Sequence, residues 1–278
     1  MPLSLDAWWI MLRQMSRSWL DDYALSMGAA LAYYTLFSLA PLLLIVIAVA
    51  GLVFGEDAAR GEISAQLRSL MGEGGAQAVQ GLLASVHKPA EGVAATVLGA
   101  VLLFVGATTV FSELQDALDR IWRAPTPLRP GGWFSLVRAR LLSFGMILAI
   151  GFLLTVSLVV SATLALMGRW LEPVFGGWLA VASAASAIGG FVLVAVTFAL
   201  IYKVMPRVRV QWKDVWIGAL FTAVLFTLGK SLIGFYLGRS GVVSGFGAAG
   251  SLVVVLLWVY YSAQIFLIGA EFTWAYAN

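Results

Sequence analysis

The stretch Ser251–Tyr276, near the end of the chain, places the strongest constraint on the fold. It is long and apolar enough to cross a bilayer as a helix, because about 20 mostly apolar residues span roughly 30 Å. It also carries Gln264 near its middle and Glu271 farther along. A carboxylate in hydrocarbon costs about 2.5 kcal/mol or more, so the side of this helix that carries Glu271 is expected to face protein or water. Other spans packed around this helix would meet that requirement.

Tyr260, Gln264 and Glu271 form one polar stripe on this helix. At about 100° per residue, the three positions fall within roughly 40° of one another. Lys230, inside the preceding apolar stretch, is the fourth intramembrane polar residue of interest. Polar groups inside membranes are candidates for functional sites, so these residues are predicted either to line a pathway or to hold helices together.

The composition of the chain is typical of a polytopic membrane protein. Of its 278 residues, 61% are hydrophobic and 11% are charged, whereas soluble domains average about 45–50% apolar and about 25% charged residues. We therefore predict an all-α fold, with one six-helix membrane domain over residues 1–278. No repeat of fixed period is visible, and no three-plus-three inverted repeat is detected. The six predicted transmembrane helices are Ala24–Phe54, Val93–Ser112, Leu141–Met167, Trp178–Tyr202, Val215–Leu237 and Ser251–Tyr276.

Two further helical segments are predicted outside these spans. Residues 3–20 carry apolar residues at helical spacing together with Arg13 and Arg17, which suits an amphipathic helix on an anionic membrane surface. Residues 56–92 are hydrophilic, and their apolar residues repeat at helical spacing on both sides of a glycine cluster that begins at Gly72. A small extracytoplasmic helical hairpin is predicted there, inserted between the first and second spans.

The basic residues predict how the spans are oriented. With the N-terminus inside, eleven basic residues fall on the cytoplasmic side and five fall outside. This distribution agrees with the excess of Lys and Arg in cytoplasmic loops of membrane proteins. Six spans then place both the N- and C-termini in the cytoplasm.

Pro41 lies inside the first predicted span, Ala24–Phe54. Proline removes one backbone donor and disturbs the carbonyl four residues earlier, so a bend is predicted there. A structural kink is one interpretation, because kinked helices are common in membranes, and a functional hinge at Pro41 is the other.

An ion pair between Lys230 and Glu271 is not expected from their depths. At 1.5 Å per residue, Lys230 lies about 6 Å above the midplane and Glu271 about 10 Å below it, and a gap of roughly 16 Å is too long for contact. Gln264 is instead the expected neighbour of Lys230. Glu271 is expected to meet the cytoplasmic arginines, for example near Arg138 or Lys203.

The sequence contains no catalytic or metal-binding constellation. It has no cysteine and a single histidine, His87, and it lacks a Walker lysine loop, GxSxG and HExxH. Asp116 and Asp119 are interpreted as a solvated helix face, in which Asp116 can pair with Arg120. We therefore expect no enzyme activity, no cofactor, no metal and no nucleic-acid partner.

Several ordered motifs resemble the YihY/BrkB family of bacterial inner-membrane proteins. They are GAALAYYTLFSLAPLLL, ELQDALDRIW, YKVMP, WKDVWIGAL and GAAGSLVVVLLWVYYSAQIFLIGAEF, in that order along essentially the whole chain. The resemblance implies a six-helix inner-membrane protein with cytoplasmic termini. The motifs follow the family pattern without serious departure, although the cytoplasmic tail that often follows the last span is not expected here.

The resemblance does not imply a settled activity. Members of the family are labelled as virulence or serum-resistance factors, as transporters and, formerly, as a ribonuclease. The sequence gives the ribonuclease label no support, because it has no metal-binding carboxylate cluster, no catalytic histidine and no basic surface for stacking RNA.

Three functional hypotheses follow. The first is a transporter or flippase-like protein that moves a lipid or small solute without its own ATPase. The alternative is a non-transporting envelope scaffold, associated with virulence, whose hairpin at residues 56–92 binds a partner. A membrane-embedded enzyme is the third. Membrane lipids and an unidentified solute or lipid substrate are the expected partners, and a homo-oligomer is compatible with the sequence.

Overall fold

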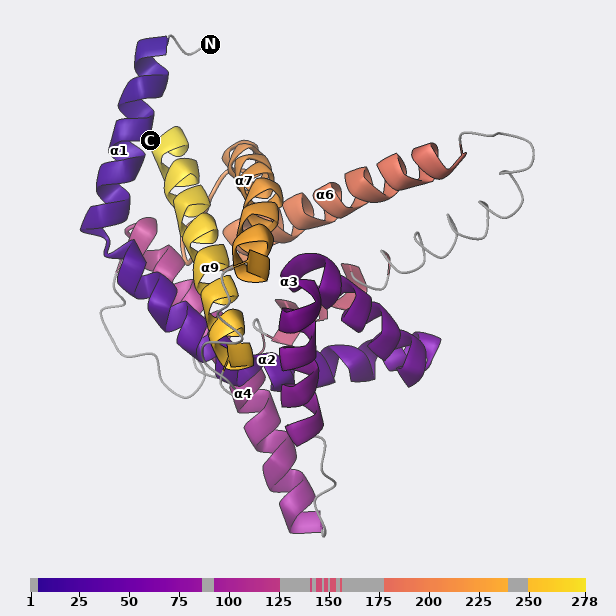
Figure 1. Ribbon diagram of the computed structural model, residues 1–278. Coiled ribbons are helices and arrows are strands. Elements are labelled where there is room, and N and C mark those ends of the chain that lie inside the picture. Colours follow the sequence, from indigo (N-terminus) through magenta and orange to yellow (C-terminus); the bar gives the residue numbers. More distant parts are fainter. Residues whose placement is uncertain are drawn as a thin grey trace.

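The structure is a computed structural model that describes residues 5–86, 93–125, 178–239 and 250–278, together with parts of 141–156. Within these residues the chain forms helices and no strand, as the composition and periodicity predict. The principal helices are α1 (Leu5–Asp21), α2 (Ala24–Phe54), α3 (Glu56–Val86), α4 (Val93–Ile121), α6 (Trp178–Val204), α7 (Trp212–Arg239) and α9 (Gly250–Ala277) (Figure 1).

Four of these helices are long and apolar enough to cross a membrane. They coincide with the first, fourth, fifth and sixth predicted spans, and their apolar stretches are Ala24–Leu52, Ala187–Val204, Trp212–Tyr236 and Leu252–Ala277. The predicted second span, Val93–Ser112, lies within α4. The predicted third span, Leu141–Met167, lies mostly outside the described residues. A total of six spans therefore stays a prediction.

α9 lies at the centre of the described helices. It contacts α1, α2, α3, α4 and α7, and Figure 1 shows its C-terminal half running between α1 and α7. In its apolar stretch 44% of the residues are buried, compared with 17–28% in the other three candidate spans. The helix that carries the polar stripe is thus the one that the other helices surround, as its buried carboxylate requires.

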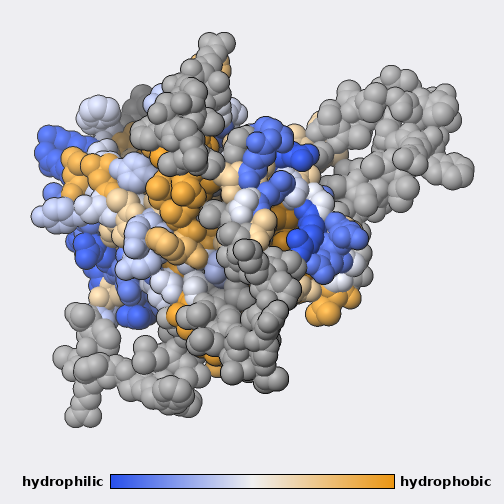
Figure 2. Space-filling model, turned by 60° about the horizontal axis from the view of Figure 1, so that its bottom comes forward, coloured by the Kyte–Doolittle hydropathy of each residue, from blue (hydrophilic) through white to orange (hydrophobic). Residues whose placement is uncertain are grey.

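α7 separates its two faces by side-chain size instead of polarity. Six of its large exposed residues recur every four positions, which forms one ridge along the helix. In lipid, small residues let helix backbones approach closely, whereas large apolar residues can face the acyl chains. Figure 2 shows hydrophobic surface bordered by hydrophilic areas on the face that it draws. The ridge comprises Trp212, Trp216, Leu220, Val224, Leu228 and Leu232, and the buried small residues include Gly218, Ala219, Thr222 and Ala223.

Two nearly identical hexapeptides meet where α7 packs against α9. IGALFT begins at Ile217 on α7, and IGAEFT begins at Ile268 on α9. Their equivalent phenylalanines, Phe221 and Phe272, stack with ring centroids 4.0 Å apart and ring planes 16° from parallel. A short internal repeat is therefore present, although it has no fixed period.

The glycines and threonines of the two hexapeptides contact each other reciprocally. A Cβ added at Gly218 would lie 1.7 Å from Thr273 Oγ1, and a Cβ added at Gly269 would lie 1.9 Å from Thr222 Oγ1. Each threonine hydroxyl donates to the glycine carbonyl one turn earlier in its own helix, at 2.7 Å in both cases. Such reciprocity is the mark of a two-fold axis, so α7 and α9 are antiparallel and related by local two-fold symmetry.

α6 joins this helix pair through Tyr202. Its side chain is fully buried, and its hydroxyl donates to the carbonyl of Phe266 at 2.8 Å. The same hydroxyl lies 3.1 Å from Thr222 Oγ1. Three membrane helices therefore meet at one small hydrogen-bonded group, which fixes their register.

α2 continues through Pro41 as one helix. The proline ring packs against α4, because a Cβ added at Gly106 would lie 3.2 Å from Pro41 Cγ. The structure thus gives Pro41 a packing contact, and a hinge at this position stays a prediction.

α1 and α3 both pack against the membrane helices. α1 coincides with the amphipathic helix predicted at residues 3–20, and it contacts α9 and α2. α3 is helical on both sides of Gly72, whose φ of 74° and ψ of 179° break the helix. Gln80 Nε2 donates to Ser64 Oγ at 3.1 Å between the two arms. Residues 87–92 of the predicted hairpin lie outside the described residues, and its extracytoplasmic location stays a prediction.

Candidate functional site

Glu271, on the cytoplasmic half of α9 in the predicted orientation, is fully buried, with 0% of its surface exposed. Neither of its carboxyl oxygens has a hydrogen-bond partner among the described residues. Burying a polar group without a hydrogen bond costs about 2–7 kcal/mol, depending on the reference state, and an unpaired charge costs more. A group retained at such a cost is the strongest candidate for function in the described part of the chain.

Two charged residues from outside α9 act on Glu271. Asp22, in the turn between α1 and α2, lies within hydrogen-bonding reach of its carboxyl group and repels its negative charge, while Arg123, just after α4, attracts it. Ionised carboxylates are acceptors only, so Asp22 and Glu271 form no hydrogen bond while both are charged. The guanidinium of Arg123 also lies 4.3 Å from the centroid of the Trp274 ring.

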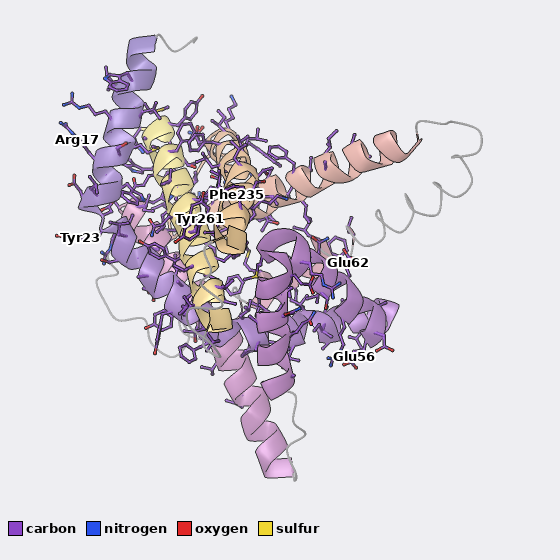
Figure 3. All side chains as sticks on the ribbon, in the orientation of Figure 1. Arg17, Tyr23, Glu56, Glu62, Phe235 and Tyr261 are labelled. Carbon is purple, nitrogen blue, oxygen red and sulfur yellow. The ribbon has the colours of Figure 1, made fainter. Side chains whose placement is uncertain are left out.

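One charged neighbour, Arg123, has an unusual backbone conformation, and the other, Asp22, directly precedes a residue that has one. Among the described residues, Tyr23, with a φ of 56°, and Arg123, with a φ of 49°, are the non-glycine residues in the left-handed region. This conformation costs roughly 1–2 kcal/mol for an ordinary L-residue. Tyr23 directly follows Asp22 at the α1–α2 junction, as its label in Figure 3 shows. Backbone strain of this kind clusters at functional sites, and here it falls on the two segments that present charges to Glu271.

Gln264 and Tyr260 face the first turns of α2. Gln264 Nε2 donates to the carbonyl of Ala24 at 3.3 Å, and its Oε1 is buried without a partner among the described residues. A Cβ added at Gly28 would lie 1.9 Å from Gln264 Nε2 and 3.6 Å from the Tyr260 ring. The polar stripe therefore meets protein along α2 and the α1–α2 junction.

Lys230 lies apart from this stripe. The adjacent Gly229 packs against Tyr261 and Ile265 of α9, because a Cβ added there would lie 3.0 Å and 2.5 Å from their side chains. Glu271 lies about ten residues farther along the helix pair, which is roughly 15 Å at 1.5 Å per residue. This separation agrees with the prediction, made from the depths of the two residues, that Lys230 and Glu271 do not form an ion pair.

Gln264 packs on α2, because Gly28 leaves space there that Gln264 fills. The expected contact between Gln264 and Lys230 stays a prediction. Lys203 donates to the carbonyl of Val210 and lies 5.2 Å from the centroid of the Trp212 ring, so its charge is engaged elsewhere. Arg138 lies outside the described residues. Arg123 supplies the basic neighbour of Glu271, and its position directly after the ELQDALDRIW helix end is the sequence signal that points to it.

The end of α4 is tied to the segment that follows α6. Gln115 Nε2 donates to the carbonyl of Met205 at 2.9 Å, and the Arg207 backbone amide donates to Asp119 Oδ1 at 2.7 Å. The Arg207 guanidinium lies 3.3 Å from Asp119 and 3.8 Å from Asp116, so Asp116 faces Arg207 and not the predicted partner in its own helix. Burial raises the pKa of Asp119, and Arg207 opposes that rise. These contacts hold the end of α4, just before Arg123, against the segment that follows α6.

No group of three or more His, Asp or Glu side chains that would hold a metal ion occurs within the described residues. The expectations of no metal, cofactor or nucleic-acid partner stay predictions.

Comparison with known proteins places the chain in a family. The family model described as virulence factor BrkB matches residues 15–278. The chain belongs to the BrkB family. This match confirms the family resemblance that the ordered motifs indicate. Two of those motifs, ELQDALDRIW and YKVMP, contact each other through the hydrogen bond between Gln115 of α4 and the Met205 carbonyl that follows α6.

Relatives of this BrkB protein are named UPF0761 membrane proteins. One from Pseudomonas paraeruginosa is 30% identical over 260 residues, covering 93% of this chain and 60% of the relative. One from Psychrobacter sp. is 28% identical over 285 residues, covering 99% and 49%. One from Verminephrobacter eiseniae is 30% identical over 251 residues, covering 88% and 57%. The chain thus spans about half to three fifths of the length of these relatives. No solved structure matches it.

Proposed function

We propose that this BrkB-family membrane protein is a transporter or flippase-like protein that moves a lipid or small solute across the bacterial inner membrane without its own ATPase. The observation that carries the proposal is the complete burial of an unpartnered Glu271 in the central membrane helix. Ionisable groups inside membranes are costly and mark substrate paths, ion paths and proton relays.

The paired hexapeptides show that helix packing does not call for this carboxylate. At the equivalent position of IGALFT, α7 carries Leu220, which is 45% exposed, whereas Glu271 of IGAEFT is fully buried. Neither position favours an ionised carboxylate, because the exposed position on α7 faces lipid and the buried position on α9 offers Glu271 no hydrogen-bond partner among the described residues. An apolar side chain fills the equivalent position on α7, so the packing of the two hexapeptides does not require the carboxylate of Glu271, which supports a functional role.

The proposal includes the arrangement in the membrane. The chain crosses six times, both termini lie in the cytoplasm, and α3 lies on the outer side. The excess of basic residues on one side of the spans, eleven against five, supports this orientation. Glu271, Asp22 and Arg123 then lie toward the cytoplasmic end of the bundle.

A scaffold that acts through α3 has less support. Ile63, Leu67 and Val79 of α3 are buried in the shared core, and α3 contacts α2, α7 and α9. α3 is therefore a packed part of the bundle and not an appendage free to bind a partner with its apolar face.

Reconstitution of the purified protein into proteoliposomes tests the proposal. Labelled phospholipids and a panel of small solutes are followed under imposed ion gradients, with Glu271→Gln and, as control, Asp57→Asn, an exposed carboxylate on α3. We expect movement of at least one substrate by the wild-type protein and the control, and at least a tenfold loss in Glu271→Gln, about 1.4 kcal/mol in a rate. Equal rates in Glu271→Gln and wild type would contradict the proposal, as would rates no higher than in protein-free vesicles.

A further inference from the structure

We infer that Glu271 and Asp22 form a proton-binding pair, in which the two carboxyl groups share one proton, and that Arg123 is the counter-ion of the pair when the proton leaves. The inference rests on the proposed function and deepens it, because it names the proton as the coupled ion.

The geometry of the two carboxyl groups calls for a proton. Glu271 is fully buried, both its oxygens lack a donor among the described residues, and the side chain within reach is a second carboxyl group, Asp22. Two carboxylates offer only acceptors, but one proton turns one of them into a donor toward the other. Two carboxyl groups that share a site do not both ionise readily, because like charges at short range repel. Binding one proton therefore satisfies an oxygen of Glu271 and removes one of the two negative charges.

Asp22 provides the route by which the proton exchanges with water. It lies in the turn between α1 and α2 and is half-buried, whereas Glu271 behind it is fully buried. A proton from water can reach Asp22 first and pass to Glu271 across their contact. On release the proton returns to water by the same two groups, and no other bond forms or breaks.

Arg123 balances the charge that release leaves behind. Its guanidinium is always protonated in proteins, and it lies over the Trp274 ring, less than one turn of α9 from Glu271. With the proton bound, the pair carries one negative charge, which Arg123 neutralises. Without the proton the pair carries two, so loss of the proton strengthens the attraction of the pair for Arg123.

Among the described residues, Asp22 and Arg123 are the charged groups that act on Glu271. α1, which also packs on α9, carries Arg13, Arg17 and Asp21. At this level α7 carries residues 217–222, none of which titrates, and the Tyr202 hydroxyl of α6 is bonded to Phe266. The acidic residues Glu56 and Glu62 of α3 lie far from the C-terminal half of α9, as Figure 3 shows.

Infrared spectroscopy of the full chain in lipid bilayers tests the inference without any transport. The C=O stretch of a protonated carboxyl group is followed as pH rises, in wild type and in Glu271→Gln, Asp22→Asn, Arg123→Gln and Asp57→Asn. In the wild type we expect one buried carboxyl band that disappears on raising the pH. Glu271→Gln should lack this band, and the Asp57→Asn control should keep it unchanged.

The two neighbouring variants should move the titration in opposite directions. Asp22→Asn removes a like charge and supplies an amide donor, so the band should be lost at a lower pH than in wild type. Arg123→Gln removes an opposite charge, so the band should persist to a higher pH. Shifts in the same direction, or no shift, would overturn the inference, as would a wild-type spectrum identical to that of Glu271→Gln. Asp22 and Arg123 lie at the margin of the bundle, so these variants keep the test valid if Glu271→Gln folds poorly.

The outcomes separate this inference from the transporter proposal. A Glu271-dependent band with the opposite shifts, in a protein that moves no substrate, would support the proton site and refute transport. Substrate movement without such a band would support transport and refute the proton site.

Discussion

Replacing Glu271 by leucine separates the contribution of this residue to stability from its contribution to activity. The substitution removes a buried, unpartnered carboxylate and leaves an apolar side chain of similar size, as Leu220 provides in the equivalent hexapeptide. Exchanging buried charges for apolar side chains is often neutral or stabilising by about 1–4 kcal/mol. We therefore expect Glu271→Leu to have an unchanged or higher Tm in detergent and to lose substrate movement in proteoliposomes.

The reverse exchange on α7 is the matched control. Leu220→Glu places a carboxylate on the exposed apolar ridge of α7, where it meets lipid, so it should lower the yield of inserted protein. A clear loss of stability in Glu271→Leu would instead show that the carboxyl group is part of the fold, and wild-type activity in this variant would remove Glu271 from the transport mechanism.

The polar stripe was predictable at the residue scale, but its partners were not. Tyr260, Gln264 and Glu271 belong to one helix, and helical periodicity alone places them on one face. Asp22 and Arg123 lie far from Glu271 in the sequence, and each is brought near it by a backbone turn that uses a left-handed residue other than glycine. Such turns leave no glycine to mark them, so sequence reasoning predicted cytoplasmic arginines near Glu271 without singling out Arg123.

Single alanine substitutions test the contact between α7 and α9 at the element scale. Gly218→Ala places a methyl group 1.7 Å from Thr273 Oγ1, so the helices must separate or Thr273 must change rotamer. Overpacking of this kind costs about 1–3 kcal/mol. We expect a lower Tm for Gly218→Ala, and partial recovery when Thr273→Ala is added, with a coupling energy of about 0.5–3 kcal/mol in a double-mutant cycle.

Gly189→Ala on α6 is the control for this experiment, because a Cβ added at Gly189 meets nothing within 4 Å. It should leave Tm unchanged or raise it, since alanine favours the helix over glycine by roughly 0.5–1 kcal/mol. Additive effects of Gly218→Ala and Thr273→Ala would show that the two positions do not pack as described.

The helices themselves were largely predictable, whereas their pairing was not. The predicted spans at Ala24–Phe54, Trp178–Tyr202, Val215–Leu237 and Ser251–Tyr276 agree with α2, α6, α7 and α9 to within a few residues, because long apolar stretches leave few alternatives. Both hexapeptides are visible in the sequence. A single pair of short segments has no regular spacing, however, that would reveal it as a repeat. Its meaning depends on the antiparallel packing of α7 and α9, which only the three-dimensional structure shows.

At the scale of the whole molecule, the described helices form one connected bundle around α9. The α1–α2 junction and the end of α4 both approach the C-terminal half of α9, where Asp22 and Arg123 reach Glu271. The segment after α6 is tied to the end of α4 through Gln115 and Arg207. These three connections therefore gather at one end of the bundle, and α3 lies toward the other.

This arrangement predicts which connections face the cytoplasm. α3 follows α2, a candidate membrane span, so α3 and the α1–α2 junction are predicted to lie on opposite sides of the membrane. Gln77 on α3 and Gln211 between α6 and α7 are both exposed, which makes them a matched pair for labelling. Because the chain has no cysteine, each can be replaced singly by cysteine without removing a native one.

In intact spheroplasts, a membrane-impermeant maleimide should label Gln77→Cys and should label Gln211→Cys only after the membrane is opened. The cysteine-free protein is the control for background labelling, and opened membranes show that both thiols react when they are reachable. The reason for this expectation is the excess of basic residues on the side that holds Gln211, which favours retention of that side in the cytoplasm. The opposite pattern would place the termini and the Glu271 cluster on the outer side. Labelling of both positions in intact spheroplasts would place both on the outer side. An even number of crossings would then separate Gln77 from Gln211 instead of the three predicted, and six spans would no longer hold.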